Sequence, residues 1–260
     1  MILTIDVGNI YTGIGIFQEG KLIKNWSFST DKNRTMDEYR FFFNNLFISG
    51  EIEISKVCGI VISSVVPPLG TTLKNVFQKY YGIEPLLVGP GVKTGINIRM
   101  DNPREVGSDR IVNAVAGHEK FPGRPLIIVD FSTATIFDLI SANGDYLGGV
   151  IAPGIQISTE ALFRSTVQLP RVELVKPPSV IGKNTVASMQ AGIIYGFIGQ
   201  VEGLIKRLKD ELKEDAYVIA TGALMDLIAA EIEMIDRKEP NLSLEGLYYL
   251  ARLNGLVTEN

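Results

Sequence analysis

The chain has 260 residues, a formal net charge of −4, 46% hydrophobic residues and 21% charged residues. This length suits one large domain or two medium ones with a full core, and the composition argues against a disordered chain. A weakly acidic chain lacks the basic surface that nucleic-acid binding requires, so we expect no nucleic-acid partner. A small anionic ligand is still compatible with this charge, because backbone amides bind anions locally.

The chain has one cysteine and one histidine, which limits the kinds of catalytic and metal site that it can form. Cys58 is the only cysteine, which excludes a disulfide framework and a thiolate zinc site. Its apolar setting, KVCGIVISSVV, predicts a buried thiol, and a single cysteine fits a reducing cytoplasm. His118 is the only histidine and has no nucleophile-elbow sequence near it, so we expect it at the surface or an interface. A carboxylate is therefore the better candidate for a general base.

The sequence predicts neither export nor membrane insertion. The N-terminus lacks the basic region and apolar stretch of a signal peptide. Residues 184–201 are uncharged over a length that raises the membrane question, but polar side chains such as Gln190 and Gln200 interrupt them. We therefore expect a buried helix in a soluble, cytoplasmic protein.

The first half of the chain alternates strand and helix patterns. Three strands separated by glycine-containing turns are followed by a helix, a strand that ends at two prolines, a helix and a short strand. The expected ranges are 2–7, 11–17 and 21–28, then 35–47, 56–66, 71–82 and 84–89. A loop with Pro103 and Gly107 then precedes an apolar helix that Ser108 or Asp109 can cap.

The pattern restarts near residue 125. Strands are expected at 125–131, 134–140, 145–153 and 216–222, and helices at 156–167, 184–214 and 223–232. Placing LTIDVGNIYTGIGIFQEGKL over IIVDFSTATIFDLISANGDYL aligns Asp6 with Asp130 and Gly20 with Gly144. This predicts duplication of one α/β unit, with halves 1–118 and 119–260 and both aspartates facing a cleft between them. The alternative is two unrelated turn aspartates.

Three segments suit phosphate or nucleotide chemistry. In the Asp6 hairpin, glycines let backbone amides approach anionic oxygens, and a carboxylate can hold a hydrated magnesium ion. Thr133 and Thr135 follow Asp130, where they are either phosphate donors or ordinary strand residues. The Thr221-Gly222 junction either supports a nucleotide or is a routine turn.

A fourth segment suits the acceptor substrate. Asp109 and Arg110 either have a structural role at the start of a helix, or Asp109 accepts a hydroxyl proton and Arg110 holds an anionic substrate group.

Taken together, the motifs resemble the type III pantothenate kinases of the actin-like, Hsp70-like and sugar-kinase superfamily. The resemblance spans nearly the whole chain. Its motifs are DVGN at 6–9, NPREVGSDR at 102–110, DFSTAT at 130–135, GGVIAPG at 148–154, ALFRSTVQLP at 161–170, IGKNT at 181–185 and NLSLEGL at 241–247. It implies an α/β fold of duplicated actin-like (ribonuclease H-like) domains, with mixed sheets flanked by helices.

The resemblance also implies an activity, which is ATP-dependent phosphorylation of pantothenate to 4'-phosphopantothenate, the first step of coenzyme A biosynthesis. Asp109 is then the general base, and Asp6 serves magnesium, directly or through water. Asp130 serves a monovalent cation, potassium or ammonium. The implied pantothenate-binding residues are Gly107, Ser108, Asp109, Arg110 and Thr185, and the implied ATP-binding residues are Asp6, Val7, Gly8, Asn9, Ile10, Tyr11, Thr12, Gly13 and Thr133.

Several positions depart from the family pattern. Ile10 removes a hydroxyl, Ser132 and Ile136 alter the second phosphate hairpin, Ser108 replaces an alanine, and Ala223 adds a Cβ after Gly222. Because Ile10, Ser132 and Ala223 all bear on ATP, they predict weak ATP affinity, whereas Ser108 is a mild change. They also motivate a second hypothesis, a regulatory protein that binds nucleotide or pantothenate with little turnover.

The long helix raises the question of a partner. Gly192, Gly196, Gly199 and Gly203 form a small-residue stripe that serves either packing within the chain or close approach of another chain. The family resemblance implies a homodimer.

Overall fold

The computed structural model describes residues 1–257 and divides into two compact units. Unit 1 consists of Met1–Phe121 together with residues 241–257, and unit 2 is Pro122–Pro240. Each unit is built on its own mixed sheet.

Unit 1 has a five-stranded sheet in the order β3-β2-β1-β4-β5. Its strands and helices are β1 (Ile2–Val7), β2 (Tyr11–Gln18), β3 (Lys21–Ser29), α1 (Met36–Ser49), β4 (Gly59–Ser64), α2 (Pro67–Tyr81), β5 (Leu86–Leu87), β6 (Asn97–Ile98), α3 (Ser108–Lys120) and α7 (Leu242–Leu253). The first three strands form an antiparallel meander, and β4 and β5 run parallel to β1 and β4 respectively.

Local sequence signals explain where the first two helices begin and end. A capping box starts α1, in which Thr35 and Glu38 satisfy each other's backbone amides. Pro67 is the first residue of α2, where a missing N–H costs nothing, so the helix starts earlier than the predicted residue 71. Gly82 ends α2 in the left-handed conformation, with φ of 68°.

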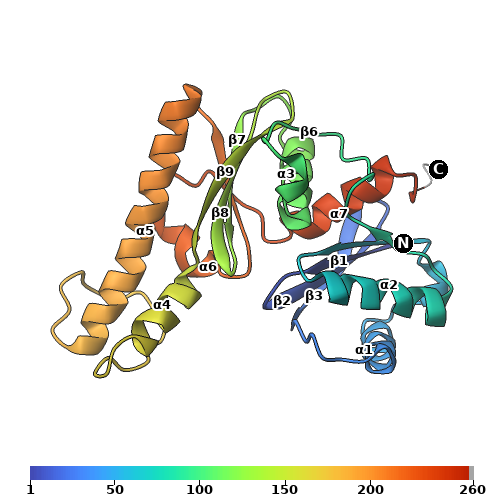
Figure 1. Cartoon of the computed structure of the whole chain (residues 1–260), viewed down its shortest axis with the longest axis horizontal. Helices are drawn as coiled ribbons and strands as arrows, with labels where there is room; N and C mark the ends of the chain where they lie inside the picture. Colours follow the sequence, from blue (N-terminus) through green and yellow to red (C-terminus); the bar gives the residue numbers. More distant parts are fainter. Residues whose placement is uncertain (258–260) are drawn as a thin grey trace. The chain divides into compact units, whose positions relative to one another are not determined.

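The period of two along β1 sorts its side chains onto two faces. Leu3, Ile5 and Val7 pack with α1 and α2, whereas Ile2 belongs to the cluster built with α3 and α7. The even-numbered residues, including Asp6, therefore share the α3 and α7 face. Figure 1 shows the two helix layers on either side of this sheet.

The C-terminal helix α7 belongs to unit 1 because it packs on β1, β4 and α3. At Gly246 a Cβ would lie 2.1 Å from the Val112 carbonyl oxygen of α3, so only glycine permits this crossing. The contacts thus group residues 241–257 with the first part of the chain. The predicted halves, 1–118 and 119–260, follow the sequence repeat instead and assign this helix to the second half.

Unit 2 repeats the strand order of unit 1. Its elements are β7 (Leu126–Phe131), β8 (Ala134–Ile140), β9 (Asp145–Pro153), α4 (Ile155–Arg164), α5 (Thr185–Leu212), β10 (Tyr217–Thr221), α6 (Met225–Ile228) and β11 (Arg237–Lys238). Within it the strands run β9-β8-β7-β10-β11, with an antiparallel meander followed by two parallel strands. The duplicated α/β architecture predicted from the sequence is therefore confirmed.

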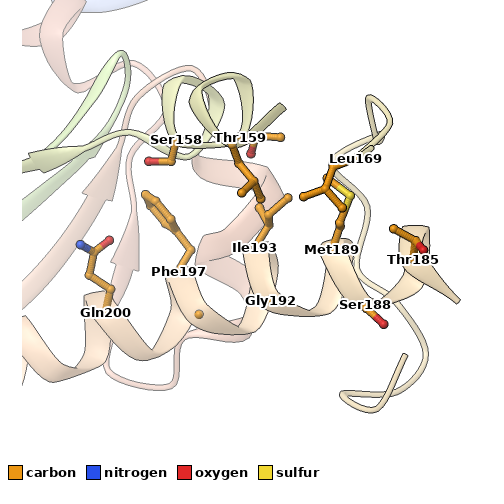
Figure 2. Close-up of a pocket in the computed structure, with 12 residues that line it drawn as sticks. Ser158, Thr159, Leu169, Thr185, Ser188, Met189, Gly192, Ile193, Phe197 and Gln200 are labelled. Atoms are coloured by element: carbon orange, nitrogen blue, oxygen red, sulfur yellow. The ribbon is translucent and has the colours of Figure 1, made fainter. Parts of the chain in front are cut away.

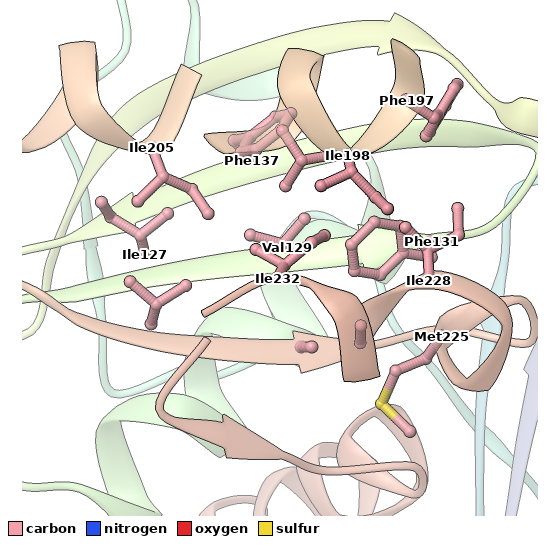
Figure 3. Packing of buried hydrophobic residues seen from close by; sticks show 14 of the residues in the cluster. Ile127, Val129, Phe131, Phe137, Phe197, Ile198, Ile205, Met225, Ile228 and Ile232 are labelled. Atoms are coloured by element: carbon pink, nitrogen blue, oxygen red, sulfur yellow. The ribbon is translucent and has the colours of Figure 1, made fainter. Parts of the chain in front are cut away.

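The repeat extends to details of the turns. Asp6 and Asp130 each occupy the next-to-last position of the first strand of a meander. Gly20 and Gly144 each turn the second hairpin with φ of 82° and 83°, a conformation that favours glycine. Unit 2 packs one face of its sheet against α5 and α6, and Figure 3 shows Ile127, Val129 and Phe131 of β7 in this cluster.

Two sequence expectations are corrected here. Cys58 is exposed, because it lies just before β4, where Val57 and Gly59 turn inward instead. The helix expected at 223–232 is α6 followed by a 3₁₀ turn, Ala229–Glu231. Across residues 1–257, none of the helices has the length and apolarity that crossing a bilayer would demand.

The α3–α7 crossing yields a stability prediction. Gly246→Ala places a methyl group against the Val112 carbonyl and should destabilise the protein by about 1–3 kcal/mol through overpacking. The matched control is Gly89→Ala in the loop after β5, where no neighbouring atom lies within 4 Å of the Cβ position and alanine should stabilise by about 0.4–1 kcal/mol. Thermal unfolding of the two variants should shift in opposite directions, and equal shifts would contradict the packing argument.

Candidate active site

The first half of the site is the carboxyl end of β1 in unit 1. In the sheet, Asp6 is paired with Gly13 of β2 and with Ser63 of β4. Ser63 is fully buried, and its hydroxyl forms a hydrogen bond with Asp6. Parallel pairing of β1 and β4 thus brings a carboxylate and a hydroxyl to one edge of the sheet.

The second half is the start of α3. Gly107 is the N-cap, and Ser108 and Asp109 open the helix. The Ser108 hydroxyl lies 3.0 Å from that of Ser63, which links the helix start to the Asp6 strand. A Cβ at Gly107 would lie 2.4 Å from Asp109 Oδ1, so glycine lets the Asp109 carboxylate fold back over the loop.

The two carboxyl groups are electrostatically coupled. The pKa of Asp6 is raised to about 6, mainly by burial and in part by the neighbouring Asp109 carboxylate, against hydrogen bonds from Ser243 and Ser63 that lower it. Burial also raises the pKa of Asp109, while the backbone amide and guanidinium of Arg110 act in the opposite direction. Both carboxylates are therefore more basic than exposed aspartates, which favours proton acceptance.

Two residues of this cluster have no counterpart among the sequence-predicted site residues. Ser243 reaches Asp6 from α7, and Ser63 reaches it from β4. Ser63 lies in the apolar run at 56–66, whose pattern predicts only a buried strand. The NLSLEGL motif is the signal that points to Ser243, because it belongs to the family pattern without an assigned role.

The turn between β1 and β2 contains the remaining residues of the first hairpin. Gly8, Asn9 and Ile10 form the turn, and Tyr11, Thr12 and Gly13 open β2. The Gly8 amide donates to the Tyr11 carbonyl at 2.9 Å. Asp6, Val7 and the turn thus form one continuous hairpin, as predicted.

In unit 2, the equivalent hairpin is packed closely by two glycines. Asp130 is paired with Thr221, and a Cβ at Gly222 would lie 2.4 Å from Asp130 Oδ1. A Cβ at Gly154 would lie 2.3 Å from the Thr133 carbonyl oxygen. These approaches explain the glycines of the Thr221-Gly222 junction and of the GGVIAPG motif.

Thr185 belongs to another surface of unit 2. It is the first residue of α5, after the N-cap Asn184, and it lines a groove of about 630 Å³ between α4 and α5. Figure 2 shows Met189, Ile193 and Phe197 on the groove wall formed by α5. The described residues that line this groove include neither Asp130 nor Thr133.

The oxygen atoms of Asp6, its serine neighbours and Asp130 are ligands that suit hard cations. Within residues 1–257, no three His, Cys, Asp or Glu side chains gather into a preformed metal cage. Magnesium is commonly held by one or two carboxylates, phosphate oxygens and water, and Asp6 with its serine neighbours supplies oxygen donors of that kind. The Asp130 carboxylate is an oxygen donor in the corresponding hairpin of unit 2.

Comparison with known structures defines the class of the fold. A Baf family protein from Campylobacter jejuni is 18% identical with a TM-score of 0.61, covering 98% of this chain and 100% of that one. Component A of the (R)-2-hydroxyglutaryl-CoA dehydratase from Acidaminococcus fermentans is 12% identical with a TM-score of 0.58, covering 97% and 98%. These likenesses show a shared fold, in which two mixed sheets are flanked by helices.

Sequence relatives define the family within this class. The model of the type III pantothenate kinases matches residues 2–207. A type III pantothenate kinase from Bacillus cytotoxicus is 51% identical over 257 residues, which cover 99% of this chain and 98% of that protein. The chain belongs to the type III pantothenate kinase family.

The raised pKa of Asp6 yields a pH prediction. Because the folded-state pKa, about 6, lies above the ordinary 3.8, ionised Asp6 destabilises the fold at neutral pH, and this cost disappears as the pH falls through that window. In metal-free protein, Asp6→Asn should therefore raise the free energy of unfolding at neutral pH by at most about 3 kcal/mol, with a shrinking gain toward pH 4.

Urea unfolding followed by the fluorescence of Trp26, the only tryptophan, reports on unit 1. The exposed Asp101 provides a control, since Asp101→Asn should leave stability nearly unchanged at each pH. An Asp6→Asn variant that is less stable than the natural chain at neutral pH would contradict the burial argument.

Proposed function

We propose that this chain transfers the γ-phosphoryl group of ATP to the primary hydroxyl of pantothenate, with Asp109 as the general base. Family membership supports pantothenate phosphorylation, the reaction that begins coenzyme A biosynthesis, and disfavours the alternative of a binding protein without turnover. The observation that carries the assignment of roles is the coupled pair Asp6 and Asp109 at one edge of unit 1.

Asp109 and its neighbours form the proposed acceptor side. The raised pKa of Asp109 favours proton acceptance from an alcohol, and Gly107 leaves room for the carboxylate. Arg110 offers a planar fork for an anionic group, such as the pantothenate carboxylate. Ser108 and Thr185 are the remaining residues proposed to bind pantothenate; Thr185 lines the α4–α5 groove.

The two hairpins form the proposed donor side. Residues 6–13 supply backbone amides for the ATP phosphates, and Thr133 contacts the nucleotide. A kinase family implies magnesium with ATP, and Asp6 is the residue that would hold it, directly or through water. The cation offsets phosphate charge when bound. Asp130 would hold potassium or ammonium.

The assignment of the base gives the first functional prediction. Asp109→Asn removes the proton acceptor but keeps the size of the side chain, so kcat for pantothenate phosphorylation should fall about 10²- to 10⁴-fold. A coupled assay with pantothenate, ATP, magnesium and potassium measures it. The exposed Asp101→Asn variant serves as the control with unchanged kcat. Full activity of Asp109→Asn would overturn the role of Asp109 as the general base. Equal activity of the natural chain with sodium in place of potassium would overturn the role of Asp130 in binding potassium.

The altered hairpins give a second functional prediction. Each lost neutral hydrogen bond costs about 0.5–1.5 kcal/mol, so KM for ATP should lie above the low micromolar range. Restoring a hydroxyl with Ile10→Thr should lower it about 2- to 10-fold. Ile23→Thr, at an exposed isoleucine of β3, is the matched control and should leave KM unchanged. A low micromolar KM for the natural chain would contradict this prediction.

A homodimer through unit 2 is also proposed. Of its apolar side chains, Val167, Val180 and Ile181 are exposed by 103%, 65% and 78%. In α5, no neighbouring atom lies within 4 Å of the Cβ position at Gly192, Gly196 or Gly199, so these three positions leave room for another chain, whereas a Cβ at Gly203 would lie 3.3 Å from the Arg207 guanidinium. Apolar surface of this kind favours burial against a second copy.

Solution mass tests this interface. The natural chain should have twice its monomer mass of 28.5 kDa, and Val180→Asp with Ile181→Asp should shift it toward the monomer. Ile48→Asp, at an isoleucine of unit 1 that is 76% exposed, is the control and should not change the mass. A monomer at micromolar concentration for the natural chain would count against the dimer.

A further inference from the structure

Thr30 lies far from residues 8–11 in sequence but contacts this turn at two points. It is the first residue after β3, and its backbone amide donates to the Ile10 carbonyl at 2.7 Å. Its hydroxyl donates to the Gly8 carbonyl at 2.8 Å. One threonine thus holds the carbonyls on both sides of Asn9.

The hydroxyl protons define a direction for this contact. A threonine hydroxyl has a single proton, and that of Thr30 is used for the Gly8 carbonyl. The Thr12 hydroxyl lies 2.9 Å from the Thr30 hydroxyl, so Thr12 must be the donor of that bond. Thr12 then has no hydroxyl proton left for a phosphate oxygen, and its side chain supports Thr30 instead.

The bond from Thr30 to the Gly8 carbonyl fixes the orientation of the Gly8–Asn9 peptide. In a trans peptide, the C=O and the following N–H point in opposite directions. With the Gly8 carbonyl held by Thr30, the Asn9 amide is directed away from Thr30. The turn is also too tight to adjust freely, since a Cβ at Gly8 would lie 2.8 Å from the Tyr11 carbonyl oxygen.

We propose that Thr30 is a positioning residue for the ATP phosphates, which sets the Gly8–Asn9 peptide so that its amide is presented to the anion. This inference rests on the proposed function, because that function assigns residues 6–13 to ATP. Thr30 itself makes no contact with the substrate in this role. Its hydroxyl supplies the orientation, and the backbone amides of the turn supply the phosphate hydrogen bonds.

Thr30→Val tests the role because it removes the hydroxyl, keeps the side-chain shape and preserves the bond from the backbone amide to Ile10. KM for ATP should rise about 2- to 10-fold, the equivalent of one hydrogen bond, while KM for pantothenate stays within about twofold. Thr30→Ser retains the hydroxyl and should restore the natural value. Thr72→Val removes a similar bond, from Thr72 to the Pro68 carbonyl in α2, and should change neither constant.

Hydrogen exchange of the ligand-free protein tests the same contact without turnover. Amides of residues 8–12 should exchange faster in Thr30→Val than in Thr30→Ser, with α2 unchanged. Unchanged exchange in this turn, or a rise of both Michaelis constants by the same factor, would overturn the inference. If the natural chain does not phosphorylate pantothenate, the proposed function fails, whereas exchange and the Kd for magnesium-ATP still decide the role of Thr30.

Discussion

The carboxyl pair of Asp6 and Asp109 is the constraint on which the rest of the account depends. Burial is the main cause of the raised pKa of each group, and the charge of Asp109 adds to the rise at Asp6. The fold tolerates the pair because hydroxyls of Ser63 and Ser243 and the guanidinium of Arg110 counteract it. Buried carboxylates whose ionisation is unfavourable suit a reaction that brings cations and a proton donor to them.

Unit 1 assembles this pair from segments that are remote in the sequence. Parallel pairing of β1 and β4 sets Asp6 beside Ser63, the Ser63–Ser108 contact attaches the start of α3, and α7 returns from the end of the chain with Ser243. The close crossing at Gly246 lets α7 reach that position. Phosphoryl transfer depends mainly on positioning and charge neutralisation, so these packing details bear directly on catalysis.

Local pattern was sufficient to predict much of this structure. The apolar alternation around Asp6 and Asp130, with Gly20 and Gly144 in the following turns, predicts the duplicated meander that the two sheets share. Residues whose roles come from long-range contacts escaped prediction. In the sequence, Ser63 resembles any polar residue at the end of a strand. The role of the Thr30 hydroxyl depends on its hydrogen bond to the Gly8 carbonyl, which no local pattern predicts. The apolar run around Cys58 predicts a buried thiol, but the residue lies just before β4 and is exposed.

A structure of the complex with pantothenate, magnesium and a non-hydrolysable ATP analogue is the most direct test of the central claim. The account predicts an Asp109 carboxylate oxygen about 2.6–3.2 Å from the primary hydroxyl of pantothenate, with Asp6 at the magnesium or one of its water ligands. A pantothenate hydroxyl bound away from Asp109, with another side chain within hydrogen-bond reach of it, would contradict the account.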